Sequence, residues 1–270
     1  MSEVFGSDAY SPKEIAARIE AVGVTKARMP LLPMCMLGML AGAFIGLGAL
    51  FFIVVRSDAS LSFAVSQVLS GLVFCLGLLL VVIAGAELFT GNNLIAMAWA
   101  DGQVSTAEVL RNWFWVCLAN FLGAFGLALL VAWSGHVQLN GGQIGQTVFR
   151  IALAKQNLSI EQALVRGVLC NALVCLAVWM AMGGRSVMDK AVAIVFPITA
   201  FVAAGFEHSI ANMYFFSLAL ILQWLDPIYG NAITVSGMLG NLIPVILGNL
   251  IGGSVLVGLV YFVIYRRPAQ

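Results

Sequence analysis

The sequence predicts an all-α membrane protein with six transmembrane helices, arranged as two inverted repeats of three helices each. Three observations support this fold class. Hydrophobic residues make up 61% of the chain and charged residues only 9%, against about 45–50% and about 25% in a soluble domain. Six apolar stretches reach the roughly 20 residues that a helix needs to cross a bilayer. One polar motif also occurs twice, in the second and the fifth of these stretches.

The composition also excludes several classes of function. The 270 residues include 13 lysines and arginines and 12 aspartates and glutamates, too few to cover a soluble enzyme or to keep a chain disordered. The net charge of +1 also excludes a nucleic-acid-binding protein. The five cysteines lie within apolar runs and show no metal-ligand spacing, so we expect no metal and no cofactor.

The six predicted spans fix the topology, because an even number places both chain ends on one side. Lysines and arginines are concentrated on cytoplasmic segments. Nine of these residues lie on the side of the termini and four on the other side, which predicts that both termini are cytoplasmic. The spans cover approximately 31–55, 63–100, 112–134, 163–182, 191–225 and 238–265. The nine are Lys13, Arg18, Lys26, Arg28, Arg111, Arg185, Lys190, Arg266 and Arg267, and the four are Arg56, Arg150, Lys155 and Arg166.

The domain organisation follows from these spans. Residues 1–30 form a cytoplasmic segment, in which Ser11-Pro12-Lys13-Glu14 predicts a capping box that starts an amphipathic helix, with Gly23 as its expected stop. Residues 31–265 form the six-span domain, with halves of about 31–134 and 163–265, and residues 266–270 form a cytoplasmic tail.

The repeated motif, G-x-E-x-x-x-x-N at 85–92 and 205–212, predicts that the second and fifth helices are broken. A second repeat, Asn120-x-x-Gly123 and Asn249-x-x-Gly252, supports the division into two halves, and an odd number of spans in each half makes them inverted. Irregular backbone at membrane depth survives only when it is buried in protein or lines a wet cavity. The N-terminus of a half-helix favours a small anion, so the breaks predict an anion path.

The polar residues at the breaks are the candidate site. Glu87 and Glu207 are the only acidic residues within the spans, and we expect each to accept hydrogen bonds from backbone N–H groups freed by the break, as loop scaffold. Asn92 and Asn212 are expected to brace the same loops. His208, opposite Thr90 of the other half, is expected to act in the pore, because an imidazole titrates near neutrality.

Three segments together resemble the formate/nitrite transporter family: 85–92, 205–213 and 241–249, the last reading Asn-Leu-Ile-Pro-Val-Ile-Leu-Gly-Asn. The stretch 184–190 is similar to the formate members of that family. The resemblance covers residues from about 10 to 267. It implies a homopentamer in the bacterial inner membrane, with one aquaporin-like pore in each protomer.

The resemblance also implies roles for individual residues. Thr90 and His208 would lie at the centre of the pore, and Lys155 and Asn171 would attract anions from outside. Apolar constrictions exclude hydrated ions; the outer one would consist of Phe74, Leu78 and Phe201, and the cytoplasmic slit of Leu88, Phe89 and Val174.

The expected function is therefore a formate channel, not an enzyme, that passes nitrite, acetate or lactate less specifically. We further expect external acid to shift it towards proton-coupled uptake through His208. Alternatives are a nitrite or hydrosulfide channel of the same family and an aquaporin-like pore for neutral solutes. An aquaporin would carry paired Asn-Pro-Ala motifs, where this chain has Thr90-Gly-Asn and Ser209-Ile-Ala. A membrane enzyme would require catalytic groups that the spans lack.

Overall fold

The computed structural model describes residues 9–266, and its regular elements are helices. The predicted residues 1–8 of the N-terminal segment and 267–270 of the tail, with Arg267, lie outside the described residues. The longer helices are α1 (Pro12–Ala27), α2 (Leu31–Arg56), α3 (Phe63–Leu79), α5 (Thr106–Trp133), α6 (Gln143–Gln156), α7 (Ile160–Gly183), α8 (Val187–Ala203), α9 (Ser209–Leu225) and α10 (Val235–Leu250). The shorter ones are η2 (Leu80–Gly85), η3 (Gly91–Ile95), α4 (Ala96–Ala100), η4 (His136–Gln138), η5 (Asn140–Gly142), η6 (Pro227–Tyr229), η7 (Ile251–Leu259) and α11 (Val260–Tyr265).

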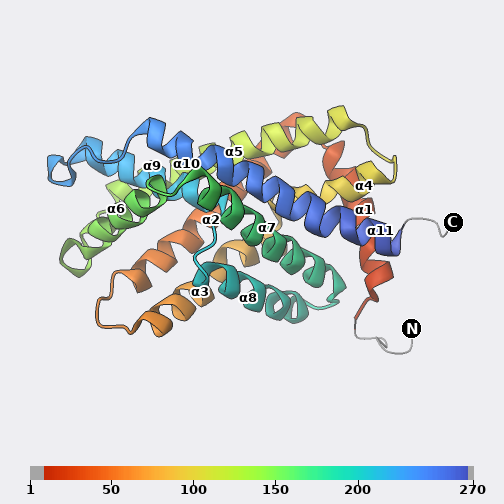
Figure 1. Cartoon of the computed structure of the whole chain (residues 1–270), viewed down its shortest axis with the longest axis horizontal. Coiled ribbons are helices and arrows are strands. Elements are labelled where there is room, and N and C mark those ends of the chain that lie inside the picture. The colour runs from red at the N-terminus through yellow and green to blue at the C-terminus, as the bar shows by residue number, and fades with distance from the viewer. Residues whose placement is uncertain (1–8, 267–270) are drawn as a thin grey trace.

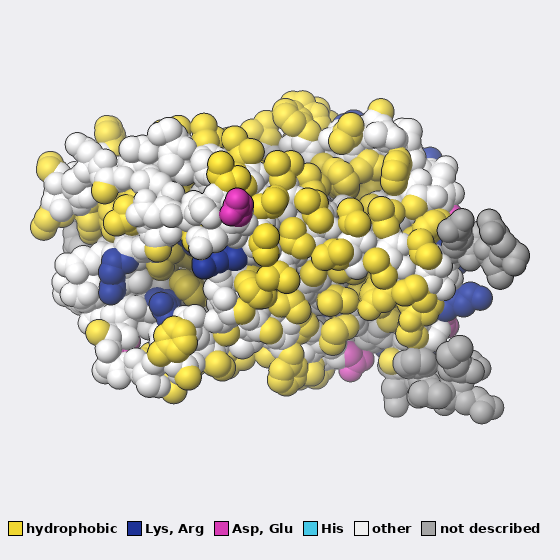
Figure 2. Space-filling model, in the orientation of Figure 1, with side chains coloured by type: hydrophobic (Ala, Val, Ile, Leu, Met, Phe, Trp, Pro, Cys, Tyr) yellow, Lys and Arg dark blue, Asp and Glu magenta, His cyan; other side chains and the backbone are white. Residues whose placement is uncertain are grey.

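Within residues 9–266, five helices are long and apolar enough to cross a membrane. They are Leu31–Arg56, Phe63–Gly85, Thr106–Trp133, Ile160–Gly183 and Val235–Tyr265. The predicted fifth span, 191–225, is divided between α8 and the shorter apolar helix α9. On the face shown in Figure 2, hydrophobic side chains gather over the middle of the molecule, as lipid-facing helices require.

The N-terminal helix α1 starts as predicted but ends later. The Ser11–Glu14 capping box is confirmed, since Glu14 N–H donates to Ser11 Oγ and Ser11 N–H donates to the Glu14 carboxylate. The expected stop at Gly23 is wrong, because the helix continues to Ala27. A Cβ atom on Gly23 would lie 3.3 Å from the Ala98 Cβ, so this glycine serves the close packing of α1 against α4.

Two further predictions from hydropathy need correction. Helix α5 begins at Thr106 rather than near residue 112, because Ser105 and Glu108 form another capping box. The stretch between the third and fourth predicted spans, for which no helix was predicted, contains the helix α6. The 14 residues of α6 mix polar and apolar side chains, so the helix is too short and too polar to be predicted as a transmembrane span.

The chain leaves helical geometry at two places along the second and fifth predicted spans. Residues 86–90 separate η2 from η3, and 204–208 separate α8 from α9. Gly85 and Gly205 have φ angles of 87° and 71°, in the left-handed region that favours glycine. The leading glycine of each G-x-E motif is therefore required by the backbone turn.

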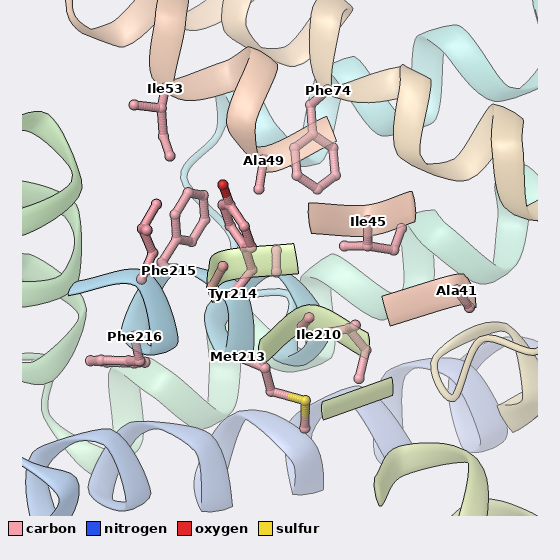
Figure 3. Close-up of a cluster of buried hydrophobic side chains, with 14 of the residues drawn as sticks. Ala41, Ile45, Ala49, Ile53, Phe74, Ile210, Met213, Tyr214, Phe215 and Phe216 are labelled. Carbon is pink, nitrogen blue, oxygen red and sulfur yellow. The ribbon is translucent and has the colours of Figure 1, made fainter. Parts of the chain in front are cut away.

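Helix α9 lies at the centre of the core. Thirteen of its 17 residues are buried, from Ser209 onwards through Leu222, which is typical of a helix surrounded by protein. Side chains of α9, including Tyr214 and Phe215, pack against Ala49 and Ile53 of α2 (Figure 3). Helices α1 and α11 lie side by side at one end of the molecule, and α6 lies at the other end (Figure 1).

Candidate functional site

The two interrupted segments meet at one hydrogen bond. The Thr90 Oγ1 atom lies 3.0 Å from His208 Nε2, and both residues are buried. His208 is also the N-cap of α9, where its Nδ1 accepts from Ala211 N–H at 3.2 Å. An acceptor nitrogen carries no proton, so in the neutral ring Nε2 carries it and donates to Thr90. The hydroxyl hydrogen of Thr90 is then available to another acceptor.

Two cavities flank this contact. The cavity of about 360 Å³ is lined by Lys26 of α1, by Leu88 and by Gly91, the residue after Thr90; we call it the inner cavity, after the side that the sequence predicts to be cytoplasmic. The cavity of about 80 Å³ is lined by His208 and by Lys155 of α6, and we call it the outer cavity. The Thr90–His208 contact therefore lies where the two cavities approach each other.

A buried polar group lines the inner cavity. Glu87 accepts from Lys26 Nζ at 2.7 Å and from Asn92 Nδ2 at 2.8 Å. Lys26 Nζ also donates to Asn92 Oδ1 at 2.9 Å. Asn112 of α5 completes the group, since it accepts from Asn92 at 3.0 Å and donates to the Lys26 carbonyl at 3.0 Å. The buried carboxylate is thus paired with a cation, and each of its oxygens accepts a hydrogen bond.

The outer cavity has the matching group. Glu207 accepts from Lys155 Nζ at 2.9 and 3.0 Å and from Asn212 Nδ2 at 2.6 Å. Asn241 of α10 accepts from Asn212 at 2.8 Å and donates to the Lys155 carbonyl at 3.0 Å. The two groups have the same four residue types and nearly the same bonds, so each cavity wall carries a neutralised carboxylate.

The carboxylates do not have the partners expected from sequence. They accept from lysine and asparagine side chains rather than from freed backbone N–H groups. The freed N–H groups have other acceptors: Phe89 N–H donates to Asn120 Oδ1, and Ser209 N–H donates to Asn249 Oδ1. Hydrogen bonds from a lysine ammonium group to a carboxylate are stronger than those from neutral donors, so the two lysines stabilise the buried carboxylates. Because Ser209 N–H and Ala211 N–H already donate to side chains, fewer backbone N–H groups at the start of α9 are free to bind an anion than at an uncapped helix N-terminus.

Aromatic and aliphatic side chains surround the polar contact. The Phe201 ring stacks on the His208 ring with centroids 5.9 Å apart, and Phe74 packs edge-on against Phe201 at 5.7 Å. Both phenylalanines line the outer cavity. Leu78, grouped with them by resemblance, lines the inner cavity together with Leu88.

Thr90 itself lines neither of these two cavities, and neither do three other residues assigned from the resemblance. Phe89 and Val174 are buried in the main hydrophobic cluster. Asn171 lies behind the Thr90 loop, where its Nδ2 is 3.2 Å from the Thr90 carbonyl and 2.7 Å from both Asn93 Oδ1 and the Asn249 carbonyl. Its position is that of a brace for the loop.

Sequence reasoning missed the roles of five residues of the site. Lys26 was counted only as a basic residue of the cytoplasmic side, and Asn112 and Asn241 were not singled out. Asn120 was noted in a repeat but given no role, as was Asn249. The repeat itself held the signal, because the spacing of Lys26 from Asn112 equals that of Lys155 from Asn241.

Comparisons with known proteins identify the family of this chain. The family described as "Formate/nitrite transporter" matches residues 13–263. The chain is 38% identical to the formate channel FocA of Escherichia coli (strain K12), over 96% of each chain. It is 37% identical to a probable formate transporter of Methanothermobacter thermautotrophicus, over 97% of this chain and 99% of that one.

Two solved structures are also similar. One is described as a pentameric formate channel with formate bound, with a TM-score of 0.82, 37% identity and coverage of 88% of this chain and 98% of that one. The other is an FNT family ion channel, with a TM-score of 0.84, 32% identity and coverage of 94% and 99%. On this evidence the chain, a multi-pass membrane protein, belongs to the formate/nitrite transporter family.

Proposed function

We propose that the chain is a channel for formate and related small monovalent anions. The observation that carries the proposal is the buried Thr90–His208 hydrogen bond between the two cavities. With His208 Nε2–H donating to Thr90, the Thr90 hydroxyl can donate its own hydrogen to a carboxylate. The relatives described as formate channels support formate as the substrate.

Passage of a hydrated anion is limited by the apolar side chains around this contact. Phe74 and Phe201 on the outer side and Leu88 on the inner side offer no hydrogen bonds, and all three are buried. An anion that passes them loses water, at a penalty of several kcal/mol unless it is replaced. The Thr90 hydroxyl replaces part of that hydration. A small anion with one charge therefore crosses more readily than a large or divalent one.

The lysine–glutamate pairs prepare both approaches to the contact. Lys155 in the outer cavity and Lys26 in the inner cavity each neutralise a carboxylate that would otherwise repel the solute. We assign Glu87 and Glu207, with Asn92 and Asn212, to the scaffold of the two loops. Lys155 receives entering anions on the outer side, and Asn171 braces the Thr90 loop.

We further propose that His208 couples transport to protons when the outside is acidic. Protonation at Nδ1 displaces the Ala211 N–H that now donates to it, so the charged ring gives up the cap of α9. An anion beside the ring compensates, because its negative charge favours the imidazolium. The protonated ring can hand a proton to formate, which leaves as neutral formic acid.

The proposed architecture has six crossings in two inverted halves around an aquaporin-like pore. It is supported by the two helix interruptions and by the matched polar groups of the two cavities. The fifth crossing consists of α8 followed by α9. The second consists of α3 and η2, followed by η3 and α4.

The proposed assembly is a homopentamer in the bacterial inner membrane, with both termini in the cytoplasm. The solved relative described as a pentameric formate channel supports the pentamer. The positions of α1 and α11 at the same end of the molecule support a common side for the termini (Figure 1).

The experiment is stopped-flow uptake by proteoliposomes, comparing formate, nitrite, hydrosulfide, acetate and lactate, and water as the neutral solute. The proposal expects formate to be fastest, with the other anions slower and water slow. A higher rate for nitrite or hydrosulfide would favour the family alternatives. Water flux without anion flux would favour the aquaporin-like alternative and reject the proposal.

A further inference from the structure

Asn120 of α5 connects three segments at the inner loop. Its Nδ2 donates to the Glu87 carbonyl at 2.9 Å and to the Gly38 carbonyl of α2 at 2.7 Å. Its Oδ1 accepts from Phe89 N–H at 2.9 Å. The side chain is fully buried. One amide thus holds the backbone of Glu87 and Phe89, on both sides of Leu88, and Phe89 directly precedes Thr90.

Asn249 of α10 makes the same three contacts in the other half. Its Nδ2 donates to the Glu207 carbonyl at 3.0 Å and to the Gly167 carbonyl of α7 at 2.9 Å, and its Oδ1 accepts from Ser209 N–H at 3.0 Å. It is also fully buried. This amide holds the backbone on both sides of His208.

The glycines near each asparagine make this reach possible. A Cβ atom on Gly42 would overlap the Asn120 carbonyl, and one on Gly123 would overlap the Met39 carbonyl. In the other half, a Cβ atom on Gly252 would overlap the Val168 carbonyl. The N-x-x-G repeat therefore brings two helices close enough for a short amide to bridge both of them and the loop.

We propose that Asn120 and Asn249 are positioning residues that fix the two pore loops and thereby set the size of the anion that passes. The effect on anion size rests on the proposed anion channel, whereas the anchoring of the two loops does not. The amide of Asn120 fixes Leu88 and Thr90, and that of Asn249 fixes His208. Without these bonds, each loop loses the anchors on both sides of its central residue, and the Thr90–His208 contact widens.

The structural test is hydrogen–deuterium exchange of the purified oligomer, followed by mass spectrometry of peptides covering 85–92 and 205–212. Asn120→Leu has a similar volume and makes none of the three bonds. We expect it to speed exchange in 85–92 about tenfold, as the loss of a buried hydrogen bond of about 1.4 kcal/mol implies. The same variant should leave 205–212 unchanged. Asn249→Leu should give the opposite pattern.

Conservative variants separate anchoring from general damage. Asn120→Asp retains an acceptor for Phe89 N–H, so it should restore part of the protection of 85–92. Ser217→Ala, which removes a buried hydroxyl of α9 without a hydrogen-bond partner, is the matched control and should change neither peptide. Equal exchange changes in both loops, or none in either, would overturn the proposal.

The transport test is the ratio of lactate flux to formate flux in proteoliposomes, which does not depend on the fraction of active protein. Asn120→Asp and Asn249→Asp should raise this ratio at least about threefold, while Ser217→Ala leaves it unchanged. If a variant sped up amide exchange in its loop but left the lactate-to-formate flux ratio unchanged, the role in selectivity would be rejected. If wild-type protein carried no formate, the proposed function would fail while the exchange result still tested the anchoring.

Discussion

The outer ion pair gives a stability prediction whose size follows from burial. In Lys155→Met, the Glu207 carboxylate, whose side chain is 5% exposed, has only Asn212 as a partner. Breaking a buried pair by removing one partner costs about 3–5 kcal/mol. The Lys155 side chain is 16% exposed, so water can replace part of the lost interaction and the lower end of about 3 kcal/mol applies. At about 2–4 °C for each kcal/mol, the melting temperature should fall by about 6–12 °C.

The assay is a double-mutant cycle on the detergent-purified protein, followed by near-ultraviolet circular dichroism during heating. The double variant Lys155→Met with Glu207→Gln removes the unpaired charge and should recover more than half of the loss. Lys13→Met, at an exposed lysine of α1, is the control and should melt like the wild type. If the double variant melted as low as the single one, the loss would not come from an unpaired carboxylate, and the reasoning would be refuted.

Three other predictions test the pore, the topology and the packing. His208→Asn should retain passive formate flux in proteoliposomes, because asparagine can cap α9 and donate to Thr90, but it should lose the pH-dependent component of the flux because its side chain does not titrate. Wild-type pH dependence in this variant would reject the coupling. With an impermeant thiol reagent added to intact cells, Ala59→Cys should be labelled and Lys13→Cys should not, and the reverse would reject cytoplasmic termini. Gly42→Ala should lower the unfolding free energy by about 1–3 kcal/mol, since its Cβ overlaps α5. In the same melting assay Gly126→Ala, whose Cβ meets open space within α5, should not lower it, because alanine favours a helix more than glycine does.

Local features of the fold were predictable because their signals are local. The capping box before α1 is a four-residue pattern, and the glycine that leads each G-x-E motif indicated the positions where the chain turns. The approach of Thr90 to His208 followed from pairing equivalent segments of the two halves. Each of these inferences used residues close in sequence or the repeat itself.

The polar partners could not be predicted in the same way, because they come from distant segments. Lys26 reaches Glu87 from a helix that precedes the first span, and nothing in its own neighbourhood distinguishes it from other basic residues near the membrane. Leu78 and Asn171 were assigned by resemblance, but their cavity and contacts depend on how α3 and α7 pack. Helix α6, which supplies Lys155, is amphipathic and was hidden by a search for continuous apolar runs.

Formate uptake into proteoliposomes tests the central claim most directly, with wild-type protein compared with Thr90→Val. Valine has nearly the shape of threonine but cannot donate the hydrogen that we assign to the solute. The account predicts rapid formate uptake by the wild type and a fall of about tenfold in Thr90→Val, as the loss of one hydrogen bond to a charged group implies. Wild-type protein without formate uptake, or Thr90→Val with the wild-type rate, would contradict it.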